Sequence, residues 1–585
     1  MTNLFRVRRF KYILGTSVLL ISHLPGFAQS PAPPKSQPAP PESQSGSITG
    51  QVISERGQPL PGAAISIQPI NGVPLARSAT SDSSGNFKVT NLDPTLYSLS
   101  VLLPGYATIP SNRNNPPLYY RIGDNVRLEL ILGAVITGTV TNAAGEPVIA
   151  VPVRALRIRD PNGRPVADPY SYGSLRVSDD RGVYRIYGLV PGTYVVFAGV
   201  VSRGAFEITP YDDQTVTYAP SSTRDTAAEI TVHSGEEKEV DIRYRGETGH
   251  IVSGTVNSES LGTGVFLVPR DNEMGLFMTS SQVPGSSGFA ITNVPDGDYK
   301  IAAVQSLAKD PNSMNLALSD PLNISVKGAD VTGIELTPRP LGSVVGQIAM
   351  VGSTATECQG KRKPVFSEMV IETKRNIVKG DTDVVPLVWS LMGVASPNKT
   401  GNFELKNLRS GQYFFTPRFF ARYWYLQSVT LPSTAIGKGG SGSRTEATRS
   451  WTRIKNGDRI SGLTMTLAEG AGSIHGKLGA EKGTPIPAGL NIYLVPAERE
   501  KGDDVFRYFG SKVESDGSFA LNNLAPGRYW TITQVADSAE QSPDKLWLPS
   551  SADARLQLRR AAESLAREIS IKPCQNVNDY QITLK

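Results

Sequence analysis

The strongest constraint on this chain is a pair of aromatic residues, ten positions apart, that recurs five times. The pairs are Phe87 and Tyr97, Tyr184 and Tyr194, Phe289 and Tyr299, Phe403 and Tyr413, and Phe519 and Tyr529. The fifth residue after each first ring is aliphatic: Leu92, Leu189, Val294, Leu408 and Leu524. A spacing kept this strictly indicates that one structural unit is used five times.

Turn-forming residues stand before and between the two rings of each pair. The first turns are Asp82-Ser-Ser-Gly85, Asp179-Asp-Arg-Gly182, Ser286-Ser-Gly288, Asn398-Lys-Thr-Gly401 and Ser515-Asp-Gly517, and the second are clearest as Pro191-Gly192, Pro295-Asp-Gly297 and Pro526-Gly527. These residues let the backbone reverse its direction. The order turn, strand, turn, strand predicts one hairpin per unit, with both rings on its core-facing side.

A third element opens each unit with the order aliphatic, any, glycine, any, aliphatic. It occurs as Ile48-Thr-Gly50-Gln-Val52, Ile136-Thr-Gly138-Thr-Val140, Val252-Ser-Gly254-Thr-Val256, Val344-Val-Gly346-Gln-Ile348 and Ile474-His-Gly476-Lys-Leu478. Strand alternation places this glycine on the buried face, where it weakens the strand unless a bulky neighbour approaches closely. We expect a ring of the hairpin to fill the space beside the glycine.

The N-terminal residues have the composition of a secretory signal peptide. Arg6, Arg8, Arg9 and Lys11 precede an apolar run from Tyr12 to Leu24, and small residues lead to a cleavage site after Ala28. A membrane anchor would need about 20 apolar residues, which is more than this run supplies. We expect export, no transmembrane span after cleavage, and a proline-rich linker over residues 29–46.

Charge and cysteine content narrow the function classes. Cleavage after Ala28 would lower the formal net charge from +6 to +2, so the basic pI does not argue for nucleic-acid binding. Cys358 and Cys574 are the two cysteines of a chain expected in an oxidising compartment, but the sequence leaves open whether they pair. Stability therefore has to come from hydrophobic cores rather than from a disulfide framework.

The spacing of the units predicts an all-β chain of five tandem β-sandwich domains. About 111 residues are available for each unit, which suits an independent sandwich and exceeds a solenoid repeat. We place the domains at residues 47–132, 133–249, 250–340, 341–470 and 471–585. A single short helix near the C-terminus is predicted from the capping-box spacing of Ser550-Ser-Ala-Asp553 and the apolar face Leu558, Ala561, Ala562 and Leu565.

The repeated motifs resemble the carboxypeptidase regulatory-like domain. The resemblance rests on aliphatic-x-Gly-x-aliphatic, on the Asp-x-x-Gly or Asp-Gly turn before an aromatic residue, and on Pro-Gly-x-Tyr, and it is closest from Gly50 to Ala63. It implies prealbumin-like Greek-key sandwiches with a transthyretin-like or carbohydrate-binding-like fold, arranged in tandem on bacterial secreted and envelope proteins. It also implies a non-catalytic accessory role, although no peptidase domain accompanies this array.

The sequence offers little support for catalysis. His233-Ser-Gly-Glu236 has the His-x-x-Glu spacing of zinc carboxypeptidases, but a catalytic zinc needs three protein ligands and the segment has the composition of a hairpin turn. We found no nucleophile elbow and no phosphate-binding loop. We therefore expect no enzyme activity, no cofactor and no metal site, and keep an accessory part in a zinc carboxypeptidase system as a remote alternative.

A binding role has better candidates. Phe419 to Tyr425 is the densest aromatic cluster, and Tyr423, Trp424 and Tyr425 are its candidate ligand-binding residues, with core packing as the competing interpretation. The leading hypothesis is an exported binding or scaffold protein located in the periplasm, on the outer-membrane surface or outside the cell. A carbohydrate-binding protein is the alternative, so a glycan or an envelope protein is the expected partner. The oligomeric state is left open.

Overall fold

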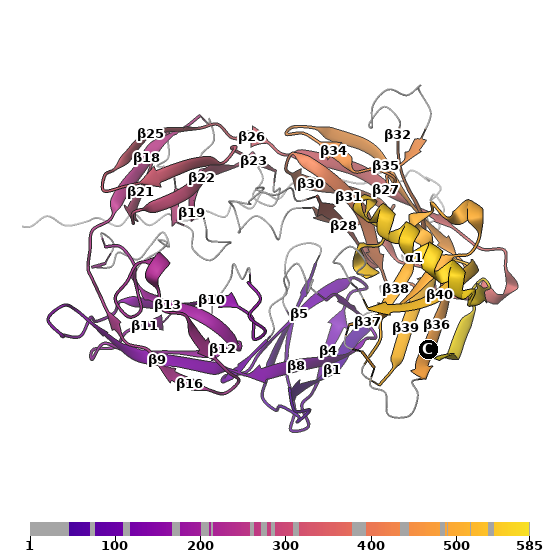
Figure 1. Ribbon diagram of the computed structural model, residues 1–585, viewed down its shortest axis with the longest axis horizontal. Coiled ribbons are helices and arrows are strands. Elements are labelled where there is room, and N and C mark those ends of the chain that lie inside the picture. The colour runs from indigo at the N-terminus through magenta and orange to yellow at the C-terminus, as the bar shows by residue number, and fades with distance from the viewer. Residues whose placement is uncertain are drawn as a thin grey trace, which may run out of the picture. The chain divides into compact units, whose positions relative to one another are not determined.

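The computed structural model describes residues 46–583 apart from several internal segments. These segments are 71–76, 109–117, 167–175, 200–209, 212–213, 258–262, 271–277, 282–286, 308–314, 377–392, 433–443, 480–485, 488, 515 and 536–542. The predicted signal peptide and nearly all of the linker lie outside the described residues. Strands dominate the described ranges, which contain one α-helix, α1 (Ala552–Leu565) (Figure 1).

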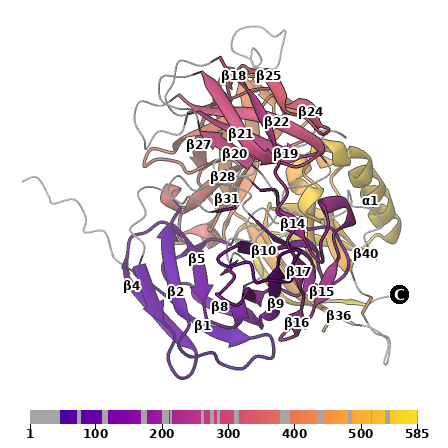
Figure 2. The ribbon, with the colours of Figure 1, turned by 90° about the vertical axis from the view of Figure 1, so that its left-hand side faces the viewer.

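The strands form five β-sandwiches, which confirms the predicted fold class. We name them sandwich 1 (β1–β8), sandwich 2 (β9–β17), sandwich 3 (β18–β26), sandwich 4 (β27–β35) and sandwich 5 (β36–β42 with α1). Each sandwich consists of two facing sheets that carry the same strand order. Figure 2 shows strands of sandwich 1, in indigo.

The first sheet of each sandwich holds the opening strand between the strand of the first ring and a closing strand. In chain order of the sandwiches these trios are β4 (Asn86–Leu92), β1 (Gly46–Ser54) and β8 (Asn125–Leu132); β12 (Val183–Leu189), β9 (Ala134–Thr141) and β16 (Glu237–Glu239) with β17 (Ile242–Arg243); β21 (Gly288–Val294), β18 (His250–Val256) and β25 (Val331–Leu336); β30 (Asn402–Leu408), β27 (Gly342–Val351) and β35 (Arg459–Glu469); and β39 (Ser518–Leu524), β36 (Gly472–Gly479) and β42 (Asn576–Thr583). The opening strand is antiparallel to the ring strand and parallel to the closing strand.

The second sheet holds the strand of the tyrosine. Its members are β3 (Arg77–Thr80), β2 (Ala64–Pro69), β5 (Leu96–Leu102) and β7 (Tyr120–Arg121); β11 (Arg176–Val177), β10 (Pro152–Arg159), β13 (Gly192–Ala198) and β15 (Ile230–Val232); β20 (Met278–Ser281), β19 (Thr263–Pro269), β22 (Gly297–Ser306) and β24 (Leu322–Val326); β29 (Val394–Ala395), β28 (Met369–Arg375), β31 (Gly411–Phe419) and β34 (Thr452–Ile454); and β38 (Phe509–Lys512), β37 (Leu490–Pro496), β40 (Gly527–Val535) and β41 (Glu568–Ile571).

Further strands extend these sheets beyond the shared set. They are β6 (Tyr106–Ala107), β14 (Thr217–Tyr218), β23 (Leu316–Leu318), β26 (Arg339–Pro340), β32 (Trp424–Pro432) and β33 (Arg444–Glu446). Among them β6, β14, β23 and β32 each follow the tyrosine strand along the chain. They become important at the contacts between neighbouring sandwiches.

The two rings of a pair do not share a hairpin, so that prediction was wrong. The ring strand β4 pairs with β1, whereas the tyrosine strand β5 pairs with β2 in the opposite sheet. The same division holds in all five sandwiches. Strand, turn and strand have the same sequence pattern whether the second strand pairs with the first or crosses to the other sheet. The rings therefore meet across the core instead of lying side by side.

Both rings of every pair are core residues, as predicted. Their exposed fractions range from 0% at Tyr529 to 5% at Tyr97, Phe289 and Phe519, and five separate apolar clusters contain one pair each. The tyrosine at the second position of each pair also donates its hydroxyl proton to the backbone carbonyl oxygen four residues earlier. The acceptors are Asp93, Val190, Pro295, Arg409 and Ala525. This tyrosine corner ties the crossing turn to the core, which explains why the second ring is always a tyrosine.

The opening-strand glycine is needed for two close approaches, only one of which was predicted. A Cβ on Gly476 would lie 2.5 Å from Cζ of Phe519, so a ring does fill this space. The same Cβ would lie 2.2 Å from the carbonyl oxygen of Tyr580 in the parallel closing strand. At Gly254 the closest atom is again a closing-strand carbonyl oxygen, that of Ile334, at 1.9 Å. The glycine thus admits both the ring and the backbone of the neighbouring strand.

The predicted helix exists, but its cap and its buried face differ from the expectation. The capping box was expected at Ser550, but Ser550 lies inside a 3-10 turn (Pro549–Ser551), and the residue before the helix is Ser551, whose side chain makes no capping hydrogen bond. Leu558 and Ala562 are buried, whereas Leu565 is 48% exposed. The helix lies on the outer face of the second sheet, where Leu558 packs with Tyr493 and Tyr508. In the described part of the chain, no helix has both the length and the apolar character needed to cross a membrane.

The segment around His233 is not a hairpin, although the sequence predicted one. Strand β15, before the turn, pairs with β13, whereas β16, after it, pairs in parallel with β9 in the other sheet. The turn therefore carries the chain from one sheet to the other. Period-two alternation does not distinguish these two connections, because both flanking strands bury alternate residues against the same core.

We predict that Gly476→Ala destabilises sandwich 5 by about 1–3 kcal/mol, because the new methyl group meets a backbone oxygen and an aromatic ring that cannot both move away. Gly479→Ala is the matched control on the same strand, since its Cβ would meet nothing closer than 3.8 Å. Denaturant unfolding of both variants measures the difference. Equal stabilities for the two variants would contradict this role of the glycine.

Candidate functional site

We call the contact between two neighbouring sandwiches a seam. The seam between sandwiches 4 and 5 is the most strongly fixed in the described structure. A disulfide joins Cys358, in the loop after β27, to Cys574, between β41 and β42, with Cα atoms 5.4 Å apart. Both residues are buried, with exposed fractions of 2% and 7%. This pairing, which the sequence left open, links positions 216 residues apart and holds the two sandwiches together covalently.

Polar and apolar contacts reinforce the disulfide. The Asn523 amide of sandwich 5 donates to the carbonyl oxygens of Ala421 and Trp424 in sandwich 4, at 2.8 and 2.7 Å. Val505 and Phe506 of sandwich 5 belong to the apolar core of sandwich 4. The predicted picture of one isolated core per unit is therefore modified at this seam, where one core continues across the boundary.

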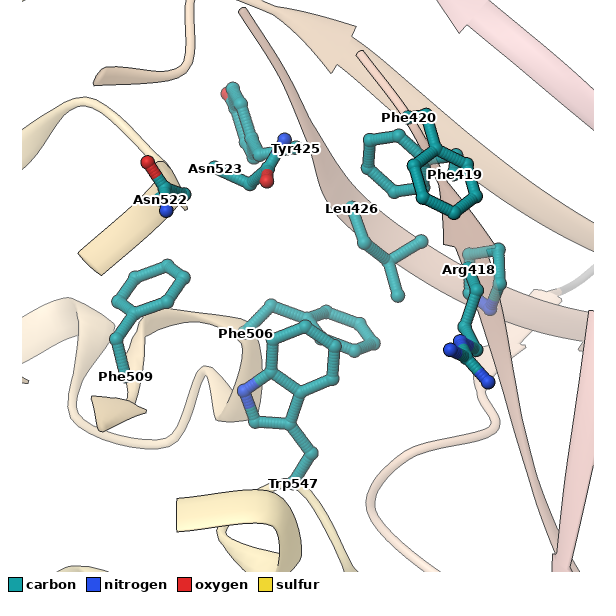
Figure 3. Close-up of a pocket in the computed structure, with 11 residues that line it drawn as sticks. Arg418, Phe419, Phe420, Tyr425, Leu426, Phe506, Phe509, Asn522, Asn523 and Trp547 are labelled. Carbon is teal, nitrogen blue, oxygen red and sulfur yellow. The ribbon is translucent and has the colours of Figure 1, made fainter. Parts of the chain in front are cut away.

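A pocket of about 340 Å³ opens along this seam (Figure 3). Sandwich 4 contributes residues from the end of β31 and from β32, and sandwich 5 contributes residues from a short 3-10 turn, β38, β39 and the segment before α1. Most lining residues carry aromatic rings, and two asparagines stand at one side. The lining residues are Pro417, Arg418, Phe419, Phe420, Tyr425, Leu426, Phe506, Phe509, Asn522, Asn523 and Trp547.

The rings of the pocket are held in place by packing and hydrogen bonds. Phe506 and Trp547 meet edge to face, with ring centroids 5.2 Å apart and an interplanar angle of 89°. The Trp547 indole N–H donates to the carbonyl oxygen of Tyr508 at 2.8 Å. Figure 3 shows Tyr425, Phe506 and Phe509 arranged around the same space. Rings fixed in this way present apolar surface to a ligand at little conformational cost.

The pocket presents little unneutralised charge. Arg418 forms an ion pair with Glu372 at 2.9 Å, and its guanidinium lies over the ring of Tyr119. Burial raises the pKa of Tyr425, so its hydroxyl stays protonated at physiological pH. Asn522 is exposed, and its side-chain amide has no hydrogen-bond partner among the described residues. The chemistry on offer is ring surface with a hydroxyl and an amide, which suits a neutral ligand.

The three predicted ligand-binding residues have different environments. Trp424 is 2% exposed within the core of sandwich 4, and its indole nitrogen has no hydrogen-bond partner in the described structure. The Tyr423 ring lies beneath Lys361, and a hydrogen bond from Asn576 lowers the pKa of its hydroxyl. Tyr425 alone among the three lines the pocket. Strand alternation separates these neighbours, with Trp424 turned inward.

Sequence reasoning missed the sandwich 5 side of the pocket. Phe506, Phe509 and Trp547 come from short turns and strand ends, far along the chain from Tyr425. No spacing in the sequence connects Trp547 to β32, because the two segments meet only through the contact between two domains.

The His-x-x-Glu segment forms a hydrogen-bonded turn. His233 Nδ1 lies 2.7 Å from Glu236 Oε2 within one exposed turn. Across the described ranges, no three histidine, cysteine, aspartate or glutamate side chains are grouped so as to hold a metal ion. The turn is accounted for by its own hydrogen bonds, including that from the His233 backbone N–H to Glu236.

We predict that replacing both cysteines, Cys358→Ser with Cys574→Ser, lowers the free energy of unfolding of sandwiches 4 and 5 by about 2–4 kcal/mol, because the cross-link restricts the unfolded chain. Differential scanning calorimetry measures the loss. The transitions of sandwiches 1 to 3, which contain no cysteine, serve as the internal control. An unchanged calorimetric profile would show that the disulfide adds nothing to the noncovalent seam.

Comparison with known proteins supports the assignment of the first unit. Residues 47–118 match the carboxypeptidase regulatory-like domain, which covers sandwich 1 up to the segment before β7. No curated protein matches the chain by sequence. The resemblance drawn from the repeated motifs is thus confirmed for the unit in which those motifs are clearest.

The solved structures that resemble parts of this chain include pilin subunits. The Bacillus anthracis TIE protein is 14% identical over 50% of this chain and 51% of its own length, with a TM-score of 0.14. The minor pilin GBS52 of Streptococcus agalactiae is 14% identical over 35% of this chain and 97% of its own, with a TM-score of 0.19. The shaft pilin SpaA of Lactobacillus rhamnosus GG is 11% identical over 34% and 98%, with a TM-score of 0.16. Similarity at this level carries no information about the function of this chain.

Proposed function

We propose that this chain is an exported, non-catalytic β-sandwich protein that acts as a scaffold or binding protein in the cell envelope or outside the cell. Its five domains occupy the residue ranges deduced from the repeats. Each sandwich encloses its own ring pair, so the domains serve as stable spacers. The binding capacity resides at a contact between domains rather than in an enzyme-like cleft.

The observation that carries this proposal is the disulfide-fixed seam between sandwiches 4 and 5. Cys358 and Cys574 are both oxidised and both buried. Disulfides persist in exported proteins and are rare in reducing compartments. A covalent tie between domains also suits a scaffold, because it preserves their contact when the surrounding medium is harsh. The seam therefore supports both the location and the role.

Export is tested by fractionating cells that produce the full chain. We expect the protein outside the cytoplasm, with its N-terminus trimmed after Ala28, and with both thiols resistant to alkylation in denaturant until a reductant is added. Mass spectrometry of the intact protein reads the cleavage and the thiol state together. An untrimmed, cytoplasmic protein with two alkylated cysteines would refute the proposal.

Carbohydrate binding is a second candidate function, favoured by the composition of the seam pocket. Aromatic faces stack on the apolar faces of sugar rings, and an amide that can donate and accept suits hydroxyl groups. Tyr425 and Asn522 supply these elements beside Phe506 and Phe509. The neutralised arginine at the pocket wall argues for an uncharged sugar rather than an acidic one.

The carbohydrate candidate is tested by calorimetric titration of residues 29–585 with cellotetraose, maltotetraose and tetra-N-acetylchitotetraose. We expect at least one to bind, and Tyr425→Ala or Asn522→Ala to weaken its affinity about tenfold, or about 1.4 kcal/mol, because each removes one contact. Tyr187→Ala, at an exposed tyrosine of sandwich 2, is the control. Absence of binding by all three sugars, or an equal loss of affinity in the Tyr187→Ala control, would count against carbohydrate binding. It would leave the scaffold proposal standing.

A further inference from the structure

The residue four positions after each first ring has a left-handed backbone in all five sandwiches. It is asparagine in four units and glycine in one: Asn91, Gly188, Asn293, Asn407 and Asn523, with φ of 58°, 72°, 64°, 59° and 54°. Each lies where the register between ring strand and opening strand shifts by one residue, which is a β-bulge. A bulge alone requires a left-handed residue, and glycine would satisfy that requirement best.

The asparagine side chain crosses to the preceding sandwich at the last two seams. Asn407 Oδ1 accepts a hydrogen bond from the backbone N–H of Leu316 in sandwich 3 at 2.9 Å. Asn523 Nδ2 donates to two backbone carbonyl oxygens of sandwich 4, at Ala421 and Trp424. The two side chains thus use opposite ends of the amide for the same task. This difference gives the position a testable chemical signature.

At the first two seams a glycine lies between the bulge residue and the preceding sandwich. A Cβ on Gly133 would lie 2.6 Å from Cα of Gly188 and 3.1 Å from the carbonyl oxygen of Gly105 in sandwich 1. A Cβ on Gly249 would lie 2.4 Å from the carbonyl carbon of Asn293 and 2.8 Å from Cγ2 of Thr215 in sandwich 2. Three chain segments therefore converge at each of these seams.

A second residue of each following sandwich lies against the same segment of its predecessor, and at three of the four seams it donates a backbone hydrogen bond to that segment. This entry residue stands five positions before the opening-strand glycine, at Gly133, Gly249, Leu341 and Ala471. Its backbone N–H donates a hydrogen bond to a backbone carbonyl oxygen of the preceding sandwich at three seams. The bonds run from Gly133 to Gly105 (2.9 Å), from Leu341 to Leu316 (3.0 Å) and from Ala471 to Tyr423 (2.9 Å). At the remaining seam the Thr215 N–H donates to Glu247 at 2.7 Å, two residues before Gly249.

We infer that the bulge residue and the entry residue together form a joint that fixes each sandwich to the one before it. The segment held by the joint lies at or just before β6, β14, β23 and β32, the strands that follow the tyrosine strand. Asparagine is placed at the last two joints because it tolerates the left-handed backbone and also reaches across the seam. The partner recognised by this surface is the preceding sandwich of the same chain.

The inference is tested by hydrogen exchange with mass spectrometry on residues 29–585. Asn407→Gly keeps the backbone but removes the acceptor, so the Leu316 amide should lose protection about three- to tenfold. Asn407→Asp keeps an acceptor oxygen and should protect Leu316 better than Asn407→Gly does. Asn523→Asp removes both amide donor hydrogens, so hydrogen exchange at the Ala471 amide should rise as much as in Asn523→Gly. Both Asn523 variants are also measured in a chain that carries Cys358→Ser and Cys574→Ser, so that the disulfide does not mask the effect.

Asn91→Gly and Asn91→Asp are the matched controls, because Asn91 has the same backbone and its side chain has no hydrogen-bond partner among the described residues. Neither should change exchange at any seam. Peptides covering Phe403 and Phe519 should stay protected in every variant, which separates a loosened joint from an unfolded sandwich. Unchanged seam protection in both glycine variants would overturn the inference. So would equal loss of protection in the core peptides.

Discussion

The close approach of a closing-segment carbonyl oxygen to the opening-strand glycine is the constraint on which every sandwich depends, and in four of the five sandwiches an aromatic ring approaches the same glycine. At Gly50 the nearest atoms to an added Cβ would be the Val126 carbonyl oxygen and the Phe87 ring. A side chain at this point would push apart the parallel strand pair and the core ring together. The tyrosine corner fixes the other sheet at the crossing turn, so the two sheets are held in register from both sides.

The features that distinguish one sandwich from another lie outside this shared frame. The ring pairs and opening glycines repeat with little change, whereas the disulfide, the pocket and the helix each occur in the fourth or fifth unit. The pocket exists because Phe506 enters the core of a neighbouring domain. The pocket therefore lies at a domain boundary, where two sandwiches combine surfaces that neither has alone.

The sequence predicted the parts of the fold that depend on strict local spacing. Five cores, the buried glycines and the C-terminal helix follow from alternation and turn composition, and the structure contains all of them. The prediction that Phe87 and Tyr97 share one hairpin was wrong, because the pattern strand, turn, strand fits a connection between two sheets as well as it fits a hairpin. The capping box expected at Ser550 is not formed, because a 3-10 turn leads directly into the helix and Ser551 lacks the extended backbone of a capping residue.

The candidate site could be predicted only in part. The aromatic cluster at residues 419–425 drew attention to the right strand, but alternation turned Trp424 into the core and left Tyr425 at the pocket. Phe509, Asn522 and Trp547 join it through contacts between domains, for which the sequence carries no periodic signal. The left-handed asparagines are visible as a repeated letter, yet their role appears only when the neighbouring sandwich is placed beside them.

The parallel pairing of opening and closing strands has a consequence for how the chain acquires its structure. Gly50 pairs with Val126, and Gly346 pairs with Leu463. The first strand of a unit therefore pairs with a strand near the end of that unit, and its sheet is complete only when nearly the whole unit has been made. Such high contact order slows folding and leaves strand edges open in the nascent chain. Each sandwich can therefore close only after its last strand has been added, so the five domains of a growing chain would complete their sheets one after another.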